Sequence, residues 1–367
     1  MNMDFFMPTR IISGRSCIAE HKALFSEFGK RAMIITGKHS AVRSGALADV
    51  TEALKSQGIE YQIFDEIEPN PLLETCFRAG GLARSYYAQF IVGIGGGSPL
   101  DAAKAVAVFG ANAIGANDLF TGRFAREPLP VIAVGTTAGT GSEVTQYSVL
   151  TVPEEANKKS FSSPKVFPRI AFVDPKYTYS MPREGTVSCG LDAFCHAVES
   201  YFGARASSFS RDAAIAALKL LWPPLKKLSE GEEIDHEDRH NLSYGSVYAG
   251  VAIANTGTCF PHAMGYQLTY WQGLSHGRAT ALFAGDFLRH CRTFDQAGVQ
   301  EIYAVCGERS LDALTAVIDR LNPCDIRLSE TEAEQYAVVT AKAKSFQNSY
   351  VEYPPANALE LYRRFCG

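Results

Sequence analysis

Four residues in the second half of the chain have the chemical character of ligands for one divalent metal ion. Asp192 and His196 lie four positions apart in GLDAFCH, which on a helix puts a carboxylate and an imidazole on one face. His262 occurs in FPHAMGY, and His276 occurs in GLSHGRAT. Three neutral imidazoles and one carboxylate suit a borderline cation such as Fe(II) or Zn(II), whereas Mg(II) prefers oxygen ligands.

Taken one at a time, these residues have simpler interpretations. Polar pairs four residues apart are common on helix surfaces, and a single histidine is more often a core or surface residue than a ligand. A metal site is favoured because these three histidines, out of eight in the chain, share one predicted helical half with a carboxylate and without a competing cysteine cluster. The ligand types do not distinguish iron from zinc.

A candidate nucleotide site lies in the first half, where IVGIGGGSPLDAAKAVAV, residues 91–108, predicts a buried strand, a glycine turn and a helix. Gly95, Gly96 and Gly97 let the backbone approach a ligand closely, and the helix that follows presents unpaired N–H groups to a phosphate. The Ser98 hydroxyl adds a donor. The glycines are consecutive, so this is not the GxGxxG fingerprint, and the tripeptide alone is also compatible with a structural turn.

A second glycine-containing polar segment, TTAGTGSEVT, follows the next predicted strand along the chain. The hydroxyl groups that we single out in it as candidate ligand contacts belong to Thr136, Thr137, Thr140 and Ser142. Ligands of open α/β sheets bind at the carboxyl ends of the strands. Two such loops from one sheet favour a nucleotide site over two structural turns.

These loops require a sheet to position them, and the first half has the alternating pattern of a parallel α/β sheet. The predicted strands are residues 31–36, 61–67, 90–93, 130–135 and 170–173. The predicted helices between them are residues 45–57, 72–87 and 99–109. Each strand is short and mostly apolar, as expected when both faces of the sheet are covered.

The metal-ligand candidates lie in the second half, which has long helical patterns and almost no β-rich run. The predicted helices are residues 187–201, 211–222, 241–254, 276–290, 299–305, 310–321 and 331–342. We therefore expect two domains, an α/β domain over residues 1–182 and a helical domain over residues 183–367.

The composition is that of an ordinary globular protein, with 46% hydrophobic and 20% charged residues and a net charge of -4. No basic footprint for nucleic acid is present. The N-terminal segment lacks the pattern of a signal peptide or membrane anchor. Nine cysteines without CxxC pairs favour reduced thiols and a cytoplasmic location.

In combination, GGGSPLDAAKA, TTAGTGSEVT, the Asp192 and His196 pair, and His262 followed by His276 resemble the iron-containing, group III, alcohol dehydrogenases over nearly the whole chain. The resemblance implies a Rossmann-like nucleotide-binding domain, a helical metal-binding domain and an active site in the cleft between them. It also implies that Asp192, His196, His262 and His276 bind the metal. The cofactor contacts that it implies are Asn70, Gly96, Gly97, Ser98, Asp101, Thr136, Thr137, Ser142 and Lys159.

The sequence departs from the family pattern at Gly37, in MIITGKHS, where many NAD-preferring relatives have an aspartate. An acidic side chain there would bind the ribose hydroxyl and repel a 2′-phosphate. Gly37 removes that obstacle, and Lys38, His39 and Ser40 favour the phosphate, so we expect NADP(H) to be preferred over NAD(H). The alternative, that Gly37 only closes a turn, is compatible with either cofactor.

A second departure is Tyr266, four residues after His262, where many relatives have a histidine thought to serve proton transfer. Tyr266 and His262 are the catalytic candidates, although tyrosine has a high reference pKa and lining the pocket is the simpler role for Tyr266. Tyr147, Phe260 and Trp271 are further candidates for apolar walls, with core packing as the alternative for each.

The resemblance implies reversible hydride transfer between a small alcohol or aldehyde and NAD(P)(H), with Fe(II), or alternatively Zn(II), as a Lewis acid. We also expect a homo-oligomer, with a dimer as the favoured state. Two enzymatic alternatives are a glycerol-type polyol dehydrogenase and a dehydroquinate-synthase-like enzyme. A third alternative is a non-catalytic nucleotide-binding subunit.

Overall fold

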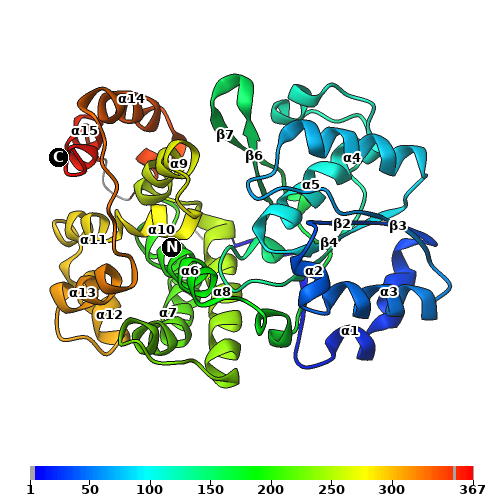
Figure 1. Ribbon diagram of the computed structural model, residues 1–367, viewed down its shortest axis with the longest axis horizontal. Helices are drawn as coiled ribbons and strands as arrows, with labels where there is room; N and C mark the ends of the chain where they lie inside the picture. The colour runs from blue at the N-terminus through cyan, green and yellow to red at the C-terminus, as the bar shows by residue number, and fades with distance from the viewer. Residues whose placement is uncertain (1–4, 350–352, 367) are drawn as a thin grey trace. The chain divides into compact units, whose positions relative to one another are not determined.

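The computed structural model describes residues 5–349 and 353–366, and the chain forms two compact units (Figure 1). One unit spans Met7–Met181 and the other begins at Pro182. Phe5 and Phe6 belong with the second unit, because the Phe5 ring packs 5.7 Å from that of Phe209. Among the described residues, no helix is both long enough and apolar enough to cross a membrane.

The first unit contains a six-stranded sheet in the order β1-β8-β5-β4-β2-β3, and every pairing in it is parallel. Its strands are β1 (Arg10–Ser13), β2 (Arg31–Thr36), β3 (Glu60–Phe64), β4 (Phe90–Gly95), β5 (Val131–Gly135) and β8 (Ile170–Val173). Its α-helices are α1 (Cys17–Glu20), α2 (Ser40–Arg43), α3 (Ala46–Ser56), α4 (Leu73–Ser85) and α5 (Gly97–Ala111). The parallel α/β sheet expected from the sequence is confirmed.

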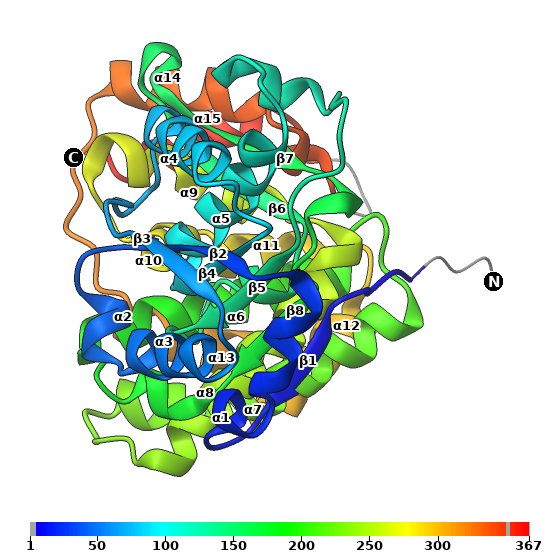
Figure 2. The same cartoon turned by 90° about the vertical axis from the view of Figure 1, so that its right-hand side faces the viewer.

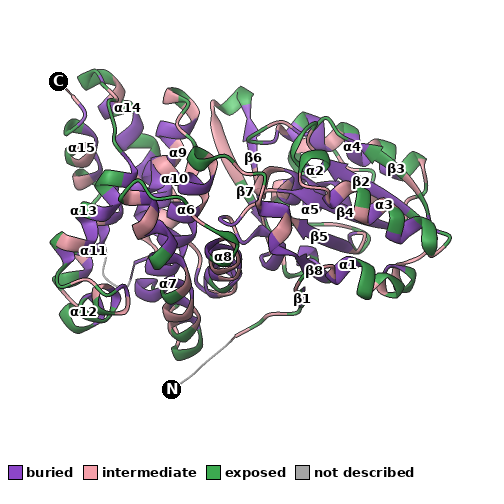
Figure 3. Cartoon of the chain, turned by 60° about the horizontal axis from the view of Figure 1, so that its bottom comes forward, coloured by how far each residue is buried: buried purple, intermediate pink, exposed green. Residues whose placement is uncertain are grey.

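Alternation along the central strands explains why helices cover both faces of this sheet (Figure 2). Met33 and Ile35 of β2 join one hydrophobic cluster with residues of α4 and α5. Ala32 and Ile34, which point the other way, join a second cluster with residues of α3. The strands β2, β4 and β5 are accordingly buried along most of their length (Figure 3).

Three strands were not expected from the sequence. β1 is an edge strand that pairs only with β8. The strands β6 (Tyr147–Val152) and β7 (Asn157–Ser162) form an antiparallel hairpin outside the main sheet. The sequence of β7, NKKSFS, has one buried residue, so backbone pairing with β6 rather than an apolar pattern defines this strand. The predicted strand 61–67 ends earlier, at Phe64.

The second unit is built of helices, as expected. They are α6 (Arg183–Phe202), α7 (Ser208–Ser229), α8 (His236–Thr256), α9 (Phe260–Gln272), α10 (His276–Ala281), α11 (Ala284–Arg292), α12 (Gln296–Val305), α13 (Leu311–Leu321), α14 (Glu330–Ala341) and α15 (Ala356–Arg363).

Three features of the helical unit differ from the sequence-based expectation. The single helix predicted over residues 276–290 is two helices, α10 and α11. The helix α15 was not predicted, and neither was α9. Pro261 lies in the first turn of α9, where a missing N–H costs no helical hydrogen bond, so this proline begins the helix rather than preventing it.

Candidate metal centre and nucleotide-binding loops

The helix α6 carries two of the metal-ligand candidates on one face. Asp192 and His196 are both buried, and Nε2 of His196 lies 4.0 Å from Oδ1 of Asp192. Nearly every residue of α6 from Thr186 to Phe202 is buried, so neighbouring helices fix the direction of this face. The pair of residues four positions apart is therefore a buried carboxylate and imidazole, and not a contact on the helix surface.

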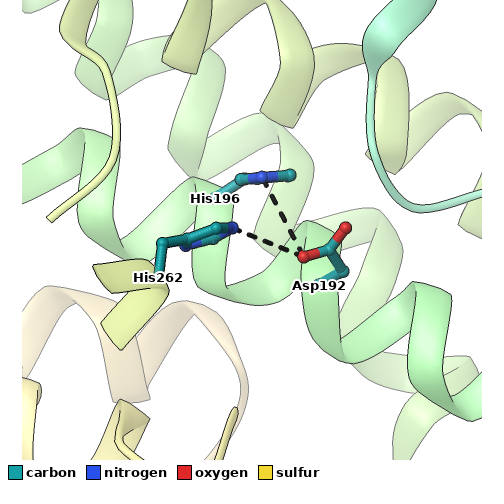
Figure 4. A group of neighbouring side chains, drawn as sticks. All are labelled: Asp192, His196 and His262. Atoms are coloured by element: carbon teal, nitrogen blue, oxygen red, sulfur yellow. Dashed lines mark ion pairs between the residues drawn. The ribbon is translucent and has the colours of Figure 1, made fainter. Parts of the chain in front are cut away.

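The third candidate, His262, reaches the same carboxylate from the first turn of α9. Its Nε2 lies 3.4 Å from Oδ1 of Asp192, and its ring stacks on that of His196 with centroids 4.6 Å apart. Both ion pairs converge on one oxygen of Asp192 (Figure 4). The three ligand atoms lie within 4.8 Å of one another, and no other such group occurs in the part of the chain that the structure describes.

His276, at the start of α10, places Nε2 3.6 Å from the same oxygen of Asp192. Its side chain is 27% exposed, in contrast to the other three. Gly277 allows this approach, because a Cβ at that position would collide with the backbone oxygen of Ser188 and lie 2.8 Å from Cβ of Asp192. The structure thus brings all four predicted metal-binding residues together.

The charges and spacing of this group suit a divalent cation. Oδ1 of Asp192 and Nε2 of His262 are buried, and neither has a hydrogen-bond partner among the described residues. Burial acts to raise the pKa of Asp192, but the facing histidines outweigh it and hold the pKa below its usual range. Ligand atoms about 2.1 Å from one ion would lie roughly 3.0–3.4 Å apart. The three histidine nitrogens lie 3.4–4.0 Å from Oδ1 of Asp192, so small side-chain shifts would bring them to this spacing.

Glu199 is a residue of this site that the sequence analysis missed. It is fully buried, its Oε1 lies 2.6 Å from Nδ1 of His262, and its Oε2 accepts a hydrogen bond from the Cys259 N–H at 2.5 Å. Burial lowers the pKa of His262, but Glu199 and Asp192 outweigh it and raise this pKa to about 9. The available signal was its position, seven residues after Asp192 and so on the same face of α6.

The aromatic candidates for pocket walls lie in different environments. The ring of Tyr266 stacks on that of His276, with centroids 5.4 Å apart and planes 13° apart. Phe260 is fully buried and its ring stacks 4.2 Å from that of Tyr353, which favours core packing, the alternative left open for this residue. Trp271 is 54% exposed near the end of α9, and Tyr147 is half-buried on β6.

In the α/β unit, the two predicted nucleotide loops lie side by side. Gly95 at the end of β4 is paired with Gly135 at the end of β5, and the N–H of Thr136 donates to the oxygen of Gly95 at 2.9 Å. A Cβ at Gly96 would lie 2.9 Å from side-chain atoms of Thr137. The absence of a side chain there is therefore required for the close packing of the two loops.

Several polar groups lie on these loops and at the start of α5. Gly96 is the N-cap of this helix and supplies no side-chain hydrogen bond to its first turn. The Ser98 hydroxyl accepts a hydrogen bond from the Asn70 N–H at 3.0 Å. The Thr136 hydroxyl is buried without a hydrogen-bond partner in the described residues. Free helix N–H groups beside hydroxyls are a suitable setting for a phosphate.

Asp101 and Ser142, two other predicted cofactor contacts, are hydrogen-bonded within the protein. The Ser142 hydroxyl donates to Oδ1 of Asp101 at 2.5 Å and accepts from Nζ of Lys104 at 2.7 Å. Lys104 also donates to the backbone oxygen of Tyr147 at 2.6 Å, and burial lowers its pKa. Lys104, which the sequence analysis did not single out, thereby joins α5 to the loop and to β6.

The remaining predicted contacts lie at two places. Thr36 of β2 is paired with Ile94 of β4, so the segment that begins at Gly37 follows the strand next to the glycine turn. Its residues Lys38, His39 and Ser40 are exposed. Lys159 lies on the hairpin, where it pairs with Glu155 at 2.8 Å and covers the ring of Phe120.

A parallel sheet with glycine and hydroxyl loops at its strand ends, together with a buried Asp and His group on helices, is the combination expected of a metal-dependent dehydrogenase that binds a nicotinamide nucleotide. Comparison with known proteins agrees. Residues 8–175 match the family model for iron-containing alcohol dehydrogenases, and residues 186–348 match the model for the C-terminal part of the same family.

Individual relatives cover most of the chain. An NADPH-dependent butanol dehydrogenase of Clostridium saccharobutylicum is 32% identical over 285 residues, 77% of this chain and 72% of that protein. An NAD-dependent methanol dehydrogenase of Bacillus methanolicus is 32% identical over 279 residues, 75% of this chain and 72% of that protein. The crystal structure of an iron-containing alcohol dehydrogenase from Thermotoga maritima matches with a TM-score of 0.92, 36% identity and 99% coverage of both chains. The chain therefore belongs to the iron-containing alcohol dehydrogenase family.

Proposed function

We propose that this protein catalyses reversible hydride transfer between a small, uncharged alcohol and NAD(P), with NADP favoured. The observation that carries the proposal is the convergence of His196, His262 and His276 on one oxygen of Asp192 in a buried site. A non-catalytic nucleotide-binding subunit would have no need of this arrangement. Two of the relatives described above are named as butanol and methanol dehydrogenases, which supports small alcohols as the substrate class.

Asp192, His196, His262 and His276 would hold the metal, Fe(II) or alternatively Zn(II). A bound divalent ion supplies Lewis acidity toward the oxygen of the alcohol or aldehyde. The neighbouring helices exclude water from three of these four residues, which strengthens their electrostatic interactions. The ring of Tyr266 covers one face of His276 and restricts the space beside it, a role that needs no proton transfer.

The start of α5 is proposed to bind the pyrophosphate of the cofactor through its free N–H groups, with Ser98 and Thr136 as hydroxyl donors. The preference for NADP rests on Gly37, which introduces no negative charge, and on the exposed cation Lys38 beside it. Relatives of similar identity are named for either cofactor, so this preference needs its own measurement.

The first test is NADPH oxidation with a panel of small aldehydes, using metal-stripped protein with and without added Fe(II) or Zn(II). Turnover that returns with a metal ion supports the dehydrogenase and identifies a usable ion. If the protein binds nucleotide but turns over no aldehyde with either ion, the proposed reaction is wrong. Replacing NADPH with NADH at equal concentration tests the cofactor preference separately.

A further inference from the structure

Glu199 has no assigned role, yet it is a buried carboxylate in close contact with His262, a metal-ligand candidate. Its side chain is fully buried, and its two oxygens contact two different parts of α9. Oε1 lies 2.6 Å from Nδ1 of His262, and Oε2 accepts from the N–H of Cys259, the N-cap residue of α9. A single carboxylate on α6 thus contacts both the start of α9 and the histidine in its first turn.

The contact with Nδ1 determines which nitrogen of His262 carries the proton in the neutral ring. A carboxylate can only accept hydrogen bonds, so Nδ1 must be protonated to bond with Glu199. The lone pair of the neutral ring is then on Nε2, the nitrogen that lies 3.4 Å from Oδ1 of Asp192. The opposite tautomer would direct an N–H toward the metal position and leave two acceptors facing each other at Nδ1.

The contact with Cys259 fixes where this ring lies. The Cys259 N–H precedes the first turn of α9, and a charge-assisted hydrogen bond there holds the start of the helix against α6. Because α6 also carries Asp192 and His196, this hydrogen bond fixes the position of His262 on α9 relative to the two candidate ligands on α6.

We propose that Glu199 is a positioning residue for the metal centre, which fixes the tautomer and orientation of His262 and so raises the affinity of the site for a divalent ion. This inference rests on the proposed function, since it takes the Asp and His group to bind metal. Carboxylates that orient metal-ligating histidines affect metal affinity by about 10–100-fold in other proteins.

The test is Glu199→Gln, measured by Co(II) binding through its visible absorption and by competition with a chelator. The amide oxygen of the substituted side chain can still accept from Cys259, but its NH2 group then faces Nδ1 of His262 and favours the wrong tautomer. We expect metal affinity to fall by about 10–100-fold and the Co(II) spectrum to change. Wild-type affinity with an unchanged spectrum would overturn the proposal.

A matched control is Glu308→Gln. Glu308 is also largely buried in the helical unit, where it accepts hydrogen bonds from Trp222 and Lys226, and it contacts none of the metal-ligand candidates. This variant should lose stability without losing metal affinity. Equal losses of metal affinity in both variants would show a general structural effect and overturn the positioning role.

If Glu199→Gln does not fold, which far-UV circular dichroism detects, wild-type protein loaded with Zn(II) decides the question. NMR of ¹⁵N-labelled histidine should then show a metal-bound ring whose Nδ1 proton is shifted downfield by a short hydrogen bond to a carboxylate. Absence of such a ring would overturn the proposal. Failure of the wild-type protein to bind Co(II) or Zn(II) would instead refute the proposed function itself.

Discussion

At the scale of single residues, the metal site contains two buried carboxylates that contact the same histidine. Asp192 and Glu199 are buried on either side of His262, so this imidazole faces two carboxylates. Removing one member therefore leaves uncompensated charge as well as an incomplete ligand set.

The first prediction concerns His262→Ala. The variant loses a ligand and leaves Asp192 and Glu199 without their shared partner, so metal-dependent turnover should fall by roughly 100-fold or more. NADPH binding, followed by nucleotide fluorescence, should be unchanged because the nucleotide loops lie in the other unit. His236→Ala, at an exposed position, serves as the control. Wild-type activity of the His262 variant would contradict the metal assignment.

The second prediction concerns cofactor choice at Gly37. Gly37→Asp should lower the ratio of kcat/KM for NADPH to that for NADH by about fivefold, as expected for roughly 1 kcal/mol of repulsion between an aspartate and a 2′-phosphate. A Cβ there would lie 2.9 Å from the backbone oxygen of Ile67, so Gly37→Ala is needed to separate crowding from charge. Equal ratios in the two variants would remove Gly37 as the determinant.

The sequence predicts a functional residue well when its partner lies on the same helix. It predicts poorly those residues whose partners lie on other elements. Asp192 and His196 are recognisable because helical spacing alone places them together. Glu199 lies on the same face, but its role depends on where α9 begins, and no spacing within α6 contains that information. Lys104 was missed for a similar reason, since its partners are on the loop and on β6.

At the scale of elements, close packing between α10 and α6 positions His276. The third prediction is that Gly277→Ala, which adds a Cβ against the backbone of Ser188, destabilises the protein by about 1–3 kcal/mol and weakens metal binding. Thermal unfolding and chelator competition measure the two effects. Gly81→Ala, where a Cβ has no neighbour within 4 Å, is the control and should not destabilise. Unchanged metal affinity in the Gly277 variant would show that the packing of α10 against α6 does not contribute to metal binding.

A fourth prediction concerns the junction of α5 with the hairpin. Lys104→Met leaves Asp101 and the Tyr147 oxygen without their buried cation, which should cost about 3–5 kcal/mol and weaken nucleotide binding. Lys165→Met removes an exposed ion pair with Glu127 and should cost at most about 1 kcal/mol. Denaturant unfolding compares the two variants, and similar midpoints would show that the Lys104 network contributes little.

The elements that the sequence analysis placed correctly are those with a pattern of their own. β2 and β8 are short apolar runs whose predicted bounds agree with the structure, because both faces of the sheet are covered. β7 has no apolar run, and it is a strand because its backbone pairs with β6. The local sequence of β7 does not predict this pairing. The helix α9 was missed because Pro261 and Gly265 resemble helix breakers, although the proline occupies the one turn where it is tolerated.

At the scale of the whole molecule, the two proposed binding functions fall on different units, and the chain contains a probe that distinguishes them. The metal-ligand candidates lie after Pro182, whereas the predicted nucleotide contacts lie between Gly37 and Lys159. Both tryptophans, Trp222 and Trp271, are in the helical unit. Tryptophan fluorescence therefore reports on unfolding of the metal-binding unit, while far-UV circular dichroism reports on both units.

The fifth prediction is that removing the metal lowers the unfolding midpoint measured by tryptophan fluorescence. Adding NADPH should instead raise the midpoint of a transition that circular dichroism detects and tryptophan fluorescence does not. A ligand at 100 times its Kd stabilises the folded state by about 2.7 kcal/mol, enough to shift a midpoint measurably. Trp222 is nearly fully buried beside Phe194 of α6, the helix that carries Asp192 and His196, so its emission should follow loss of that packing. If metal and nucleotide shift both signals equally, the two units unfold as one cooperative body. A metal effect confined to the circular dichroism signal would place the metal outside the helical unit and contradict the proposed site.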